Sequence, residues 1–313
     1  MENNELIEKI LKLKKQNNVR IIGHSYASEE LHPLADSIAC STGFVEAILD
    51  IRDNKDVIVL APTFFAEIAR VLLYDKKLTV FSPIIAECPV ANYKYLGVDY
   101  ILEFKKAHPG VPMVCYGVAP METKMHAEYI ALAGRVVDTV NSIDSPEVLF
   151  VGEGNCALHA MRKCNKKVIP YPRNPFCSMY NSLTRSDIEA KRKEYPDACI
   201  MVHAECNPRA ADVADYAMGT DEMMDFVKQD NHQTYVVGIE IDAYRRMAKV
   251  YPTKKFIHLS SRLQCNVFKT IRLEDVLACL EERKHVIRVD ESIARRIFED
   301  ARNGRAGIPQ HCL

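Results

Sequence analysis

The sequence repeats one pattern three times along its 313 residues. Three apolar runs typical of β-strands end at His24, Tyr116 and His203. Twelve residues beyond each of these strand ends stands an acidic residue, and seventeen residues beyond it stand small residues that open a predicted helix. A fixed register of this kind indicates a repeated structural unit, so the chain is constrained to three copies of one strand-and-helix motif.

Three cysteines follow the same repeat. Cys88, Cys177 and Cys265 are 89 and 88 residues apart, and each lies in a loop just past an apolar, strand-like run. In parallel sheets, ligands bind outside the carboxyl ends of the strands. A threefold pseudo-symmetric protein would point its strand ends, helix starts and cysteines at one centre, where we expect the chemistry.

Nine short β-branched runs alternate with helical patterns, which favours parallel βαβ units. The predicted fold class is α/β, with three pseudo-threefold-related three-layer α/β/α domains whose short parallel sheets surround a central cluster site. The first repeat is expected to cover residues 1–92 with the C-terminal helices 270–313, the second residues 93–185 and the third residues 186–269. Within the first repeat, residues 33–51 are predicted to form one helix.

The composition excludes several classes of protein. With 41 basic and 42 acidic residues the formal charge is −1, so we expect neither a nucleic-acid nor a membrane-surface partner. No stretch approaches the ~20 apolar residues of a membrane span, and no signal-peptide core is found, which predicts a cytoplasmic protein. Eleven cysteines in a reducing compartment are expected to be core residues, metal ligands or nucleophiles rather than disulfides.

Three convergent thiolates are one ligand short of the four that usually hold an iron-sulfur cluster. A [4Fe-4S] cluster bound by three cysteines leaves one iron open, and an open iron acts as a Lewis acid for a hydroxyl or carboxylate. The alternatives are three ordinary buried cysteines, since free cysteine is among the most buried residue types, or a scaffold stapled by zinc.

Several segments resemble the quinolinate synthases, in order and spacing, over nearly the whole chain. They are HSYASEELHPLADSIACST, FFAEIAR, AECPVANY, PFCSMYNSLT, VHAECNPRAADVADYAMGT and QCNVFKTIRLEDVLACLE. The resemblance implies three α/β domains around a [4Fe-4S] cluster held by Cys88, Cys177 and Cys265, whereas Cys206 matches a cysteine that is not a ligand. It also implies the condensation of iminoaspartate with dihydroxyacetone phosphate to quinolinate, for pyridine nucleotide biosynthesis.

By the same resemblance, further residues stand where the family has its active-site groups. Glu205 is suited to acid-base catalysis, and Tyr26 to relaying a proton or binding an oxyanion. The other matched positions are His24, His203, Ser41, Tyr116 and Thr220, and Tyr180 stands at the place of a family histidine. Hydroxyls and N–H groups at helix starts suit a carboxylate or phosphate substrate. Packing and N-capping are the alternative roles for these side chains.

The sequence departs from the family at several polar positions. Val118 replaces an asparagine, Ala133 and Gly219 replace serines, Tyr180 replaces a histidine, and the loop Glu153-Gly154-Asn155 lacks an expected lysine. Removing a partner from a buried anion costs about 1–3 kcal/mol, so several such losses weaken substrate binding. The cluster cysteines are kept while the polar residues expected around the substrate are changed. This combination predicts a paralogue, a [4Fe-4S] lyase or synthase that acts on a different small polar carboxylate substrate.

Three other functions remain open at this point. The chain can be a genuine quinolinate synthase, acting on iminoaspartate and dihydroxyacetone phosphate. It can be a diphthamide-type radical enzyme, in which the open iron binds S-adenosylmethionine. It can also be a non-catalytic iron-sulfur redox protein, although that function leaves the polar strand-end residues unexplained.

Overall fold

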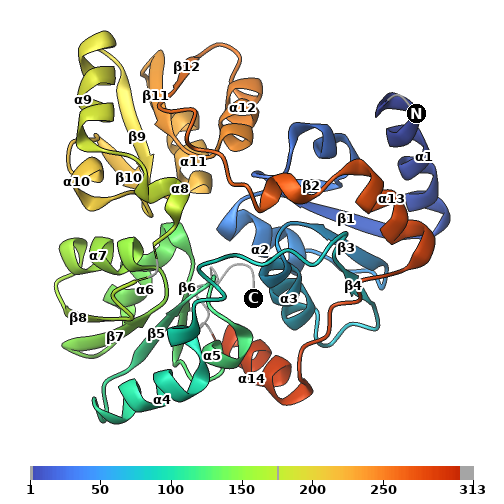
Figure 1. Cartoon of the computed structure of the whole chain (residues 1–313), viewed down its shortest axis with the longest axis horizontal. Coiled ribbons are helices and arrows are strands. Elements are labelled where there is room, and N and C mark those ends of the chain that lie inside the picture. Colours follow the sequence, from blue (N-terminus) through green and yellow to red (C-terminus); the bar gives the residue numbers. More distant parts are fainter. Residues whose placement is uncertain (1–2, 175, 304–313) are drawn as a thin grey trace. The chain divides into compact units, whose positions relative to one another are not determined.

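A computed structural model describes residues 3–174 and 176–303 (Figure 1). The chain forms two compact units, one of residues 1–88 with 266–313 and the other of residues 89–265. Together they contain three sheets, each of four parallel strands. The predicted α/β class with short parallel sheets is therefore confirmed.

The first unit contains one sheet in the order β2-β1-β3-β4. Its helix α1 is amphipathic, as its sequence predicts, and buries Leu6 and Ile10 against Leu277 and Leu280 of α13. Helix α13 thus completes the core of the first sheet, whereas α14 packs against α3. The elements are α1 (Asn3–Gln16), β1 (Val19–His24), η1 (Glu29–Leu34), β2 (Ser37–Ala39), α2 (Ser41–Leu49), β3 (Asp56–Leu60), α3 (Thr63–Leu72), β4 (Val80–Phe81), η4 (Phe268–Thr270), α13 (Leu273–Glu282) and α14 (Glu291–Arg302).

The second unit contains two sheets with the same order of strands, β6-β5-β7-β8 and β10-β9-β11-β12. Its elements are η2 (Lys94–Leu96), α4 (Val98–Lys106), β5 (Met113–Tyr116), α5 (Met121–Lys124), β6 (Tyr129–Ala131), η3 (Ala133–Arg135), α6 (Val136–Ser142), β7 (Glu147–Val151), α7 (Gly154–Lys163), β8 (Lys167–Tyr171), α8 (Ser178–Asn181), α9 (Arg185–Glu194), β9 (Cys199–His203), α10 (Pro208–Ala211), β10 (Tyr216–Met218), α11 (Thr220–Gln229), β11 (Thr234–Gly238), α12 (Ile241–Val250) and β12 (Lys255–His258). The predicted boundary near residue 185 falls inside this unit and stays a prediction, and the termini at residues 1–2 and 304–313 lie outside the described residues.

Each sheet has one strand more than the sequence predicted. The additional strands, β2, β6 and β10, are three residues long and pair in parallel with the central strand of their sheet. The prediction of one helix over residues 33–51 was wrong, because β2 interrupts it. Three residues are too few to show a strand period, so pairing with a neighbour decides their conformation.

The repeated acidic residues stabilise the sheets. Asp36, Glu128 and Asp215 each accept a backbone N–H from the central strand of their own sheet, at 2.7–2.8 Å. Each also pairs with a basic side chain, Lys14, Lys105 or Arg192, of the helix before that strand. A charge-assisted hydrogen bond to a backbone amide fixes the start of the edge strand, which explains why the acid recurs at a constant distance.

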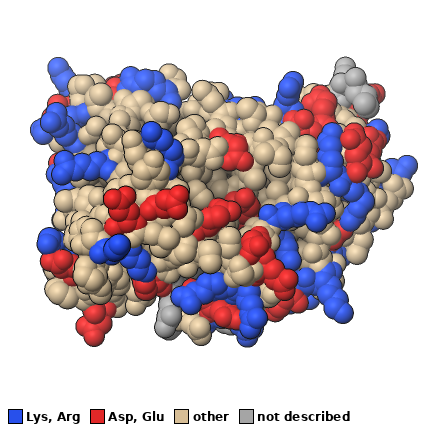
Figure 2. All heavy atoms as spheres, turned by 60° about the horizontal axis from the view of Figure 1, so that its bottom comes forward, with Lys and Arg blue, Asp and Glu red and all other residues tan. Residues whose placement is uncertain are grey.

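The surface carries both signs of charge. On the face shown in Figure 2, lysines and arginines alternate with aspartates and glutamates. Over the described residues, no helix is long and apolar enough to cross a membrane.

Candidate active site

The central strands end in a turn whose geometry is the same in two repeats. In the first unit, Nδ1 of His24 accepts the amide N–H of Tyr26 at 3.2 Å. In the second unit, Nδ1 of His203 accepts the amide N–H of Glu205 at 3.3 Å. A ring nitrogen that accepts an N–H is unprotonated, so a neutral ring at either position carries its proton on Nε2. The sequence HxY in one repeat and HxE in the other thus fixes the tautomer of each histidine.

Glu205 and Tyr116 are in direct contact in the second unit. They are 89 residues apart in the chain, yet the hydroxyl of Tyr116 donates to Oε1 of Glu205 in a short hydrogen bond. The side chain of Glu205 is 12% exposed, and Tyr116 is 3% exposed. Both had been predicted as site residues from the carboxyl ends of two different strands, and the structure brings them into contact.

Burial dominates the electrostatics of this pair. It raises the pKa of Glu205, and the hydrogen bond from Tyr116 opposes that rise. Burial, a nearby Cys156 and the Glu205 charge raise the pKa of Tyr116 well above its usual value, so the phenol keeps its proton. A carboxyl group with a raised pKa beside a phenol that donates to it is suited to transferring protons.

A second buried carboxyl, Glu153, lies near this pair. Burial first, and then the charge of Glu205, raise the pKa of Glu153 to about 8. Its oxygens accept the amide N–H groups of Cys156 at 2.7 Å and of Cys177 at 3.0 Å. Asn155 connects the loop after β7 to the turn that carries Glu205, because its side-chain amide donates to the backbone carbonyl of Glu205 at 2.9 Å.

His203 is neutral in this environment. Burial lowers its pKa to about 3, so its contact with Glu205 at 4.0 Å is not an ion pair. The ring of Tyr180 stacks on it with 4.3 Å between centroids and planes 6° apart. Tyr180 therefore covers the imidazole face, where the sequence had predicted contact with substrate.

Two of the three predicted cluster cysteines belong to this unit. Cys177 follows β8 and Cys265 follows β12, and both are partly exposed. Burial, followed by nearby charges that include Glu205 and Cys265, raises the pKa of the Cys177 thiol. Cys88, also partly exposed, follows β4 in the first unit. Within either unit, over the described residues, no three His, Cys, Asp or Glu side chains gather around one point that could hold an ion.

These cysteines fit the donor set that a three-cysteine cluster requires. Cys177 and Cys265 influence each other electrostatically, and each sits at the carboxyl end of its parallel sheet. Cys88 has the equivalent place in the first repeat. Cys206, which was not expected to be a ligand, is buried, and so are Cys40 and Cys279. Partly exposed thiols at equivalent strand ends thus differ from the packed cysteines of the core.

In the first unit, the predicted residues lie in an aromatic cluster. The ring of His24 is 4.6 Å from those of Tyr26 and Phe65, and its Nε2 is 3.3 Å from Sγ of Cys40. Lys269 donates to the backbone carbonyl of Tyr26 at 2.8 Å. These contacts hold His24 and Tyr26 at the end of β1, as the sequence predicted.

The helix starts also lie where the sequence placed them. Ser41 begins α2, Ala133 begins η3 and Thr220 begins α11. The buried hydroxyls of Ser25 and Thr42, beside His24 and Ser41, have no hydrogen-bond partner among the described residues. Buried hydroxyls are ordinarily paired, so this edge of the first sheet is suited to receive a polar ligand.

Two glutamates that the sequence analysis did not select as site residues lie at the starts of helices. Glu153 and Glu240 each follow the second long strand of their repeat, β7 or β11, by two residues, a register that was visible in the sequence. A third, Glu222, places its carboxylate against Gly134 and Gly219. No sequence signal marks Glu222, because its neighbours come from two different repeats.

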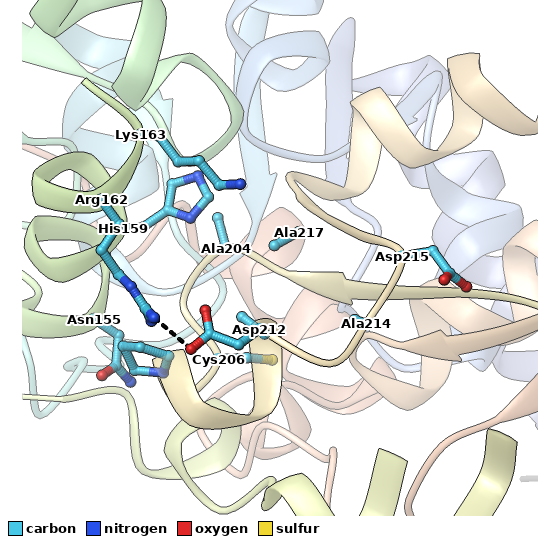
Figure 3. Close-up of a pocket in the computed structure, with 12 residues that line it drawn as sticks. Asn155, His159, Arg162, Lys163, Ala204, Cys206, Asp212, Ala214, Asp215 and Ala217 are labelled. Carbon is cyan, nitrogen blue, oxygen red and sulfur yellow. Dashed lines mark hydrogen bonds and ion pairs between the residues drawn. The ribbon is translucent and has the colours of Figure 1, made fainter. Parts of the chain in front are cut away.

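A cavity of about 160 Å³ lies between α7 and β10 (Figure 3). The turn that carries Glu205 lines it only through Ala204 and Cys206, and an ion pair between Arg162 and Asp212 crosses it. None of the predicted site residues lines this cavity. It is therefore separate from the Tyr116–Glu205 pair.

The fold and these residues define an α/β protein in which a phenol and a carboxyl group meet at the carboxyl ends of two strands. Comparison with known proteins identifies the family, since a family model described as "Quinolinate synthetase A protein" matches residues 8–301. The chain is 33% identical to the quinolinate synthase of Thermococcus kodakarensis over 297 residues, covering 95% of this chain and 96% of that protein. It is 34% identical over 294 residues to that of Pyrococcus abyssi, covering 93% and 96%. The chain belongs to the quinolinate synthase family.

Proposed function

We propose that this protein catalyses the quinolinate synthase reaction, in which iminoaspartate and dihydroxyacetone phosphate condense with loss of water and phosphate. The observation that carries the proposal is the buried Tyr116–Glu205 hydrogen bond, on the unit that also holds Cys177 and Cys265. Family membership over about 95% of the chain supports this activity over the diphthamide-type and non-catalytic alternatives.

Cys88, Cys177 and Cys265 would hold the [4Fe-4S] cluster. When bound, such a cluster supplies a Lewis-acidic iron that polarises a hydroxyl or carboxylate. Side chains of the protein then transfer the protons. Glu205 removes or returns a proton at the reacting carbon or hydroxyl, and Tyr116 stabilises its charged form by donating a hydrogen bond. The Nε2–H of His203 is available to orient an anionic oxygen.

A second candidate is a related reaction on a changed substrate, and Glu222 is the observation that favours it. A Cβ atom at Gly219 would lie 2.1 Å from the Glu222 carboxylate and 2.9 Å from the backbone nitrogen of Gly134. A serine at position 219 would therefore require Glu222 or the Gly134 backbone to move, and in this chain the carboxyl group of Glu222 lies beside the helix starts. A carboxylate there disfavours a substrate anion, which matches the loss of hydroxyls at Ala133 and Gly219.

An anaerobic assay decides between the two. Quinolinate formed at an ordinary enzyme rate of about 1 per second or faster supports the proposed reaction and overturns the changed-substrate alternative. If protein with a full complement of iron and sulfide forms none, the quinolinate synthase proposal is refuted. In that case Glu222→Ala tests the second candidate, because removal of the carboxylate is expected to improve the binding of inorganic phosphate.

A further inference from the structure

Two buried glutamates connect helix starts to the loops of the predicted cluster cysteines. Glu153 precedes α7 and is 1% exposed, and Glu240 precedes α12 and is 0% exposed. Charged side chains are almost never buried so completely unless their oxygens are hydrogen-bonded. Their partners therefore indicate what the two carboxyl groups do.

Each glutamate uses one oxygen for its own helix and the other for a cysteine. Glu153 accepts from the amide of Cys156 in α7 at 2.7 Å and from the amide of Cys177 at 3.0 Å. Glu240 accepts from the amide of Asp242 in α12 at 2.8 Å and from the amide of Cys265 at 3.4 Å. The same bridge thus recurs in the second and third repeats, with a longer contact in the third.

The first repeat makes an equivalent connection without a carboxyl group. There Thr63, at the start of α3, accepts the amide N–H of Ala86 with Oγ1 and donates its own amide to the carbonyl of Ala86, both at 2.9 Å. Ala86 precedes Cys88 by two residues. All three repeats therefore anchor the cysteine loop to the helix that follows the second long strand (β3, β7 or β11), but only the second and third repeats anchor the cysteine amide itself.

We propose that Glu153 and Glu240 are positioning residues that hold Cys177 and Cys265 in the orientation needed to bind the cluster. The ligand role of these cysteines rests on the proposed function. The anchoring itself does not, because it is a property of the protein alone. A ligand held by a rigid supporting contact loses less conformational freedom when the metal group binds, so metal affinity depends on such supporting hydrogen bonds.

The test begins with cluster-free protein and hydrogen exchange. Glu153→Gln replaces one acceptor oxygen by an NH₂ group, so amide exchange at Cys177 should accelerate about tenfold or more while the Cys265 loop is unchanged. Glu240→Gln should accelerate the Cys265 loop alone, and by less, because its contact is longer. Each variant is the control for the other, and exposed Glu189→Gln should alter neither loop. Unchanged exchange in both loops overturns the proposal.

The second measurement uses anaerobically reconstituted protein. Both variants should lose their iron and sulfide on dilution about tenfold faster than wild type, as is typical when a contact supporting a metal ligand is removed. Glu153→Asp, which keeps the carboxyl group but shortens the reach, should fall between wild type and Glu153→Gln, and it replaces the glutamine variant in this test if that variant fails to fold. Wild-type retention rates in both glutamine variants overturn the positioning role. If wild type itself binds no cluster, the proposed function fails, whereas hydrogen exchange still decides the anchoring.

Discussion

Replacing Tyr116 with phenylalanine tests the central pair most directly. The substitution removes the hydroxyl that donates to Glu205 and leaves the rest of the ring in place. A hydrogen bond to a buried charged group contributes about 1.5–3 kcal/mol. Since 1.36 kcal/mol corresponds to one pKa unit, the pKa of Glu205 should rise by about 1–2 units in the variant.

The assay is the pH dependence of kcat/KM. If Glu205 acts as a base, the acidic limb of the profile moves up by that amount, and activity near neutral pH falls about 10- to 100-fold but recovers at higher pH. If it acts as an acid, the basic limb moves up instead. The pKa of Glu205 can also be followed without substrate, through the carboxyl ¹³C shift in cluster-free protein.

A matched control separates this effect from the general loss of a tyrosine hydroxyl. Tyr251 donates to the backbone carbonyl of Met224 at 2.8 Å, and Glu205 is not among the groups that shift its pKa. Tyr251→Phe should therefore leave the profile unmoved. If Tyr116→Phe also moves neither limb nor the ¹³C titration, the hydrogen bond does not tune Glu205 and the assigned role of the pair is wrong.

Further outcomes are expected. Glu205→Gln should lower turnover about 10²- to 10⁴-fold without recovery at high pH, and full activity would contradict an acid-base role. The anaerobic protein should contain about four iron and four sulfide per chain, and zinc without sulfide would contradict a cluster. Alanine at a predicted ligand (Cys88, Cys177 or Cys265) should abolish the visible absorbance of the cluster. Alanine at a buried core cysteine (Cys40, Cys206 or Cys279) should leave that absorbance unchanged. The pKa of His203 is about 3 in the folded protein and 6.5 in the unfolded chain, so between these pH values the unfolded state binds one proton more than the folded state. As the pH falls below 6.5, the free energy of unfolding of wild type should therefore decrease by about 1.4 kcal/mol per pH unit relative to that of His203→Gln. Parallel pH dependences of unfolding for the two proteins would show that His203 is not buried neutral. Asp215→Ala should lower the free energy of unfolding by about 1–3 kcal/mol, because it removes a charge-assisted hydrogen bond to the Ile200 amide. The control Asp212→Ala removes an exposed ion pair and should lower it by about 0–1 kcal/mol. Equal losses of stability would contradict the role of Asp215 in the sheet.

Much of the fold could be predicted because local patterns recur in a constant register. All nine expected strands form with boundaries shifted by at most two residues, and all but the two-residue β4 lie in apolar β-branched runs long enough to show a pattern. Short strands such as β2 could not be predicted, because three residues gain their conformation from pairing with a neighbour. The acidic residue of each repeat was found in the sequence, but its role in the sheet required knowledge of that pairing.

The sequence by itself determined which residues stand at strand ends and helix starts, and hence that Tyr116, His203 and Glu205 belong to equivalent turns. Only the tertiary structure decided which of them touch. Tyr116 and Glu205 are joined across 89 residues, Tyr180 stacks on His203, and Glu222 lies against glycines of two repeats. Register is a property of local chain geometry, whereas contacts between repeats depend on how whole sheets pack, and burial in that packing sets the pKa of each group.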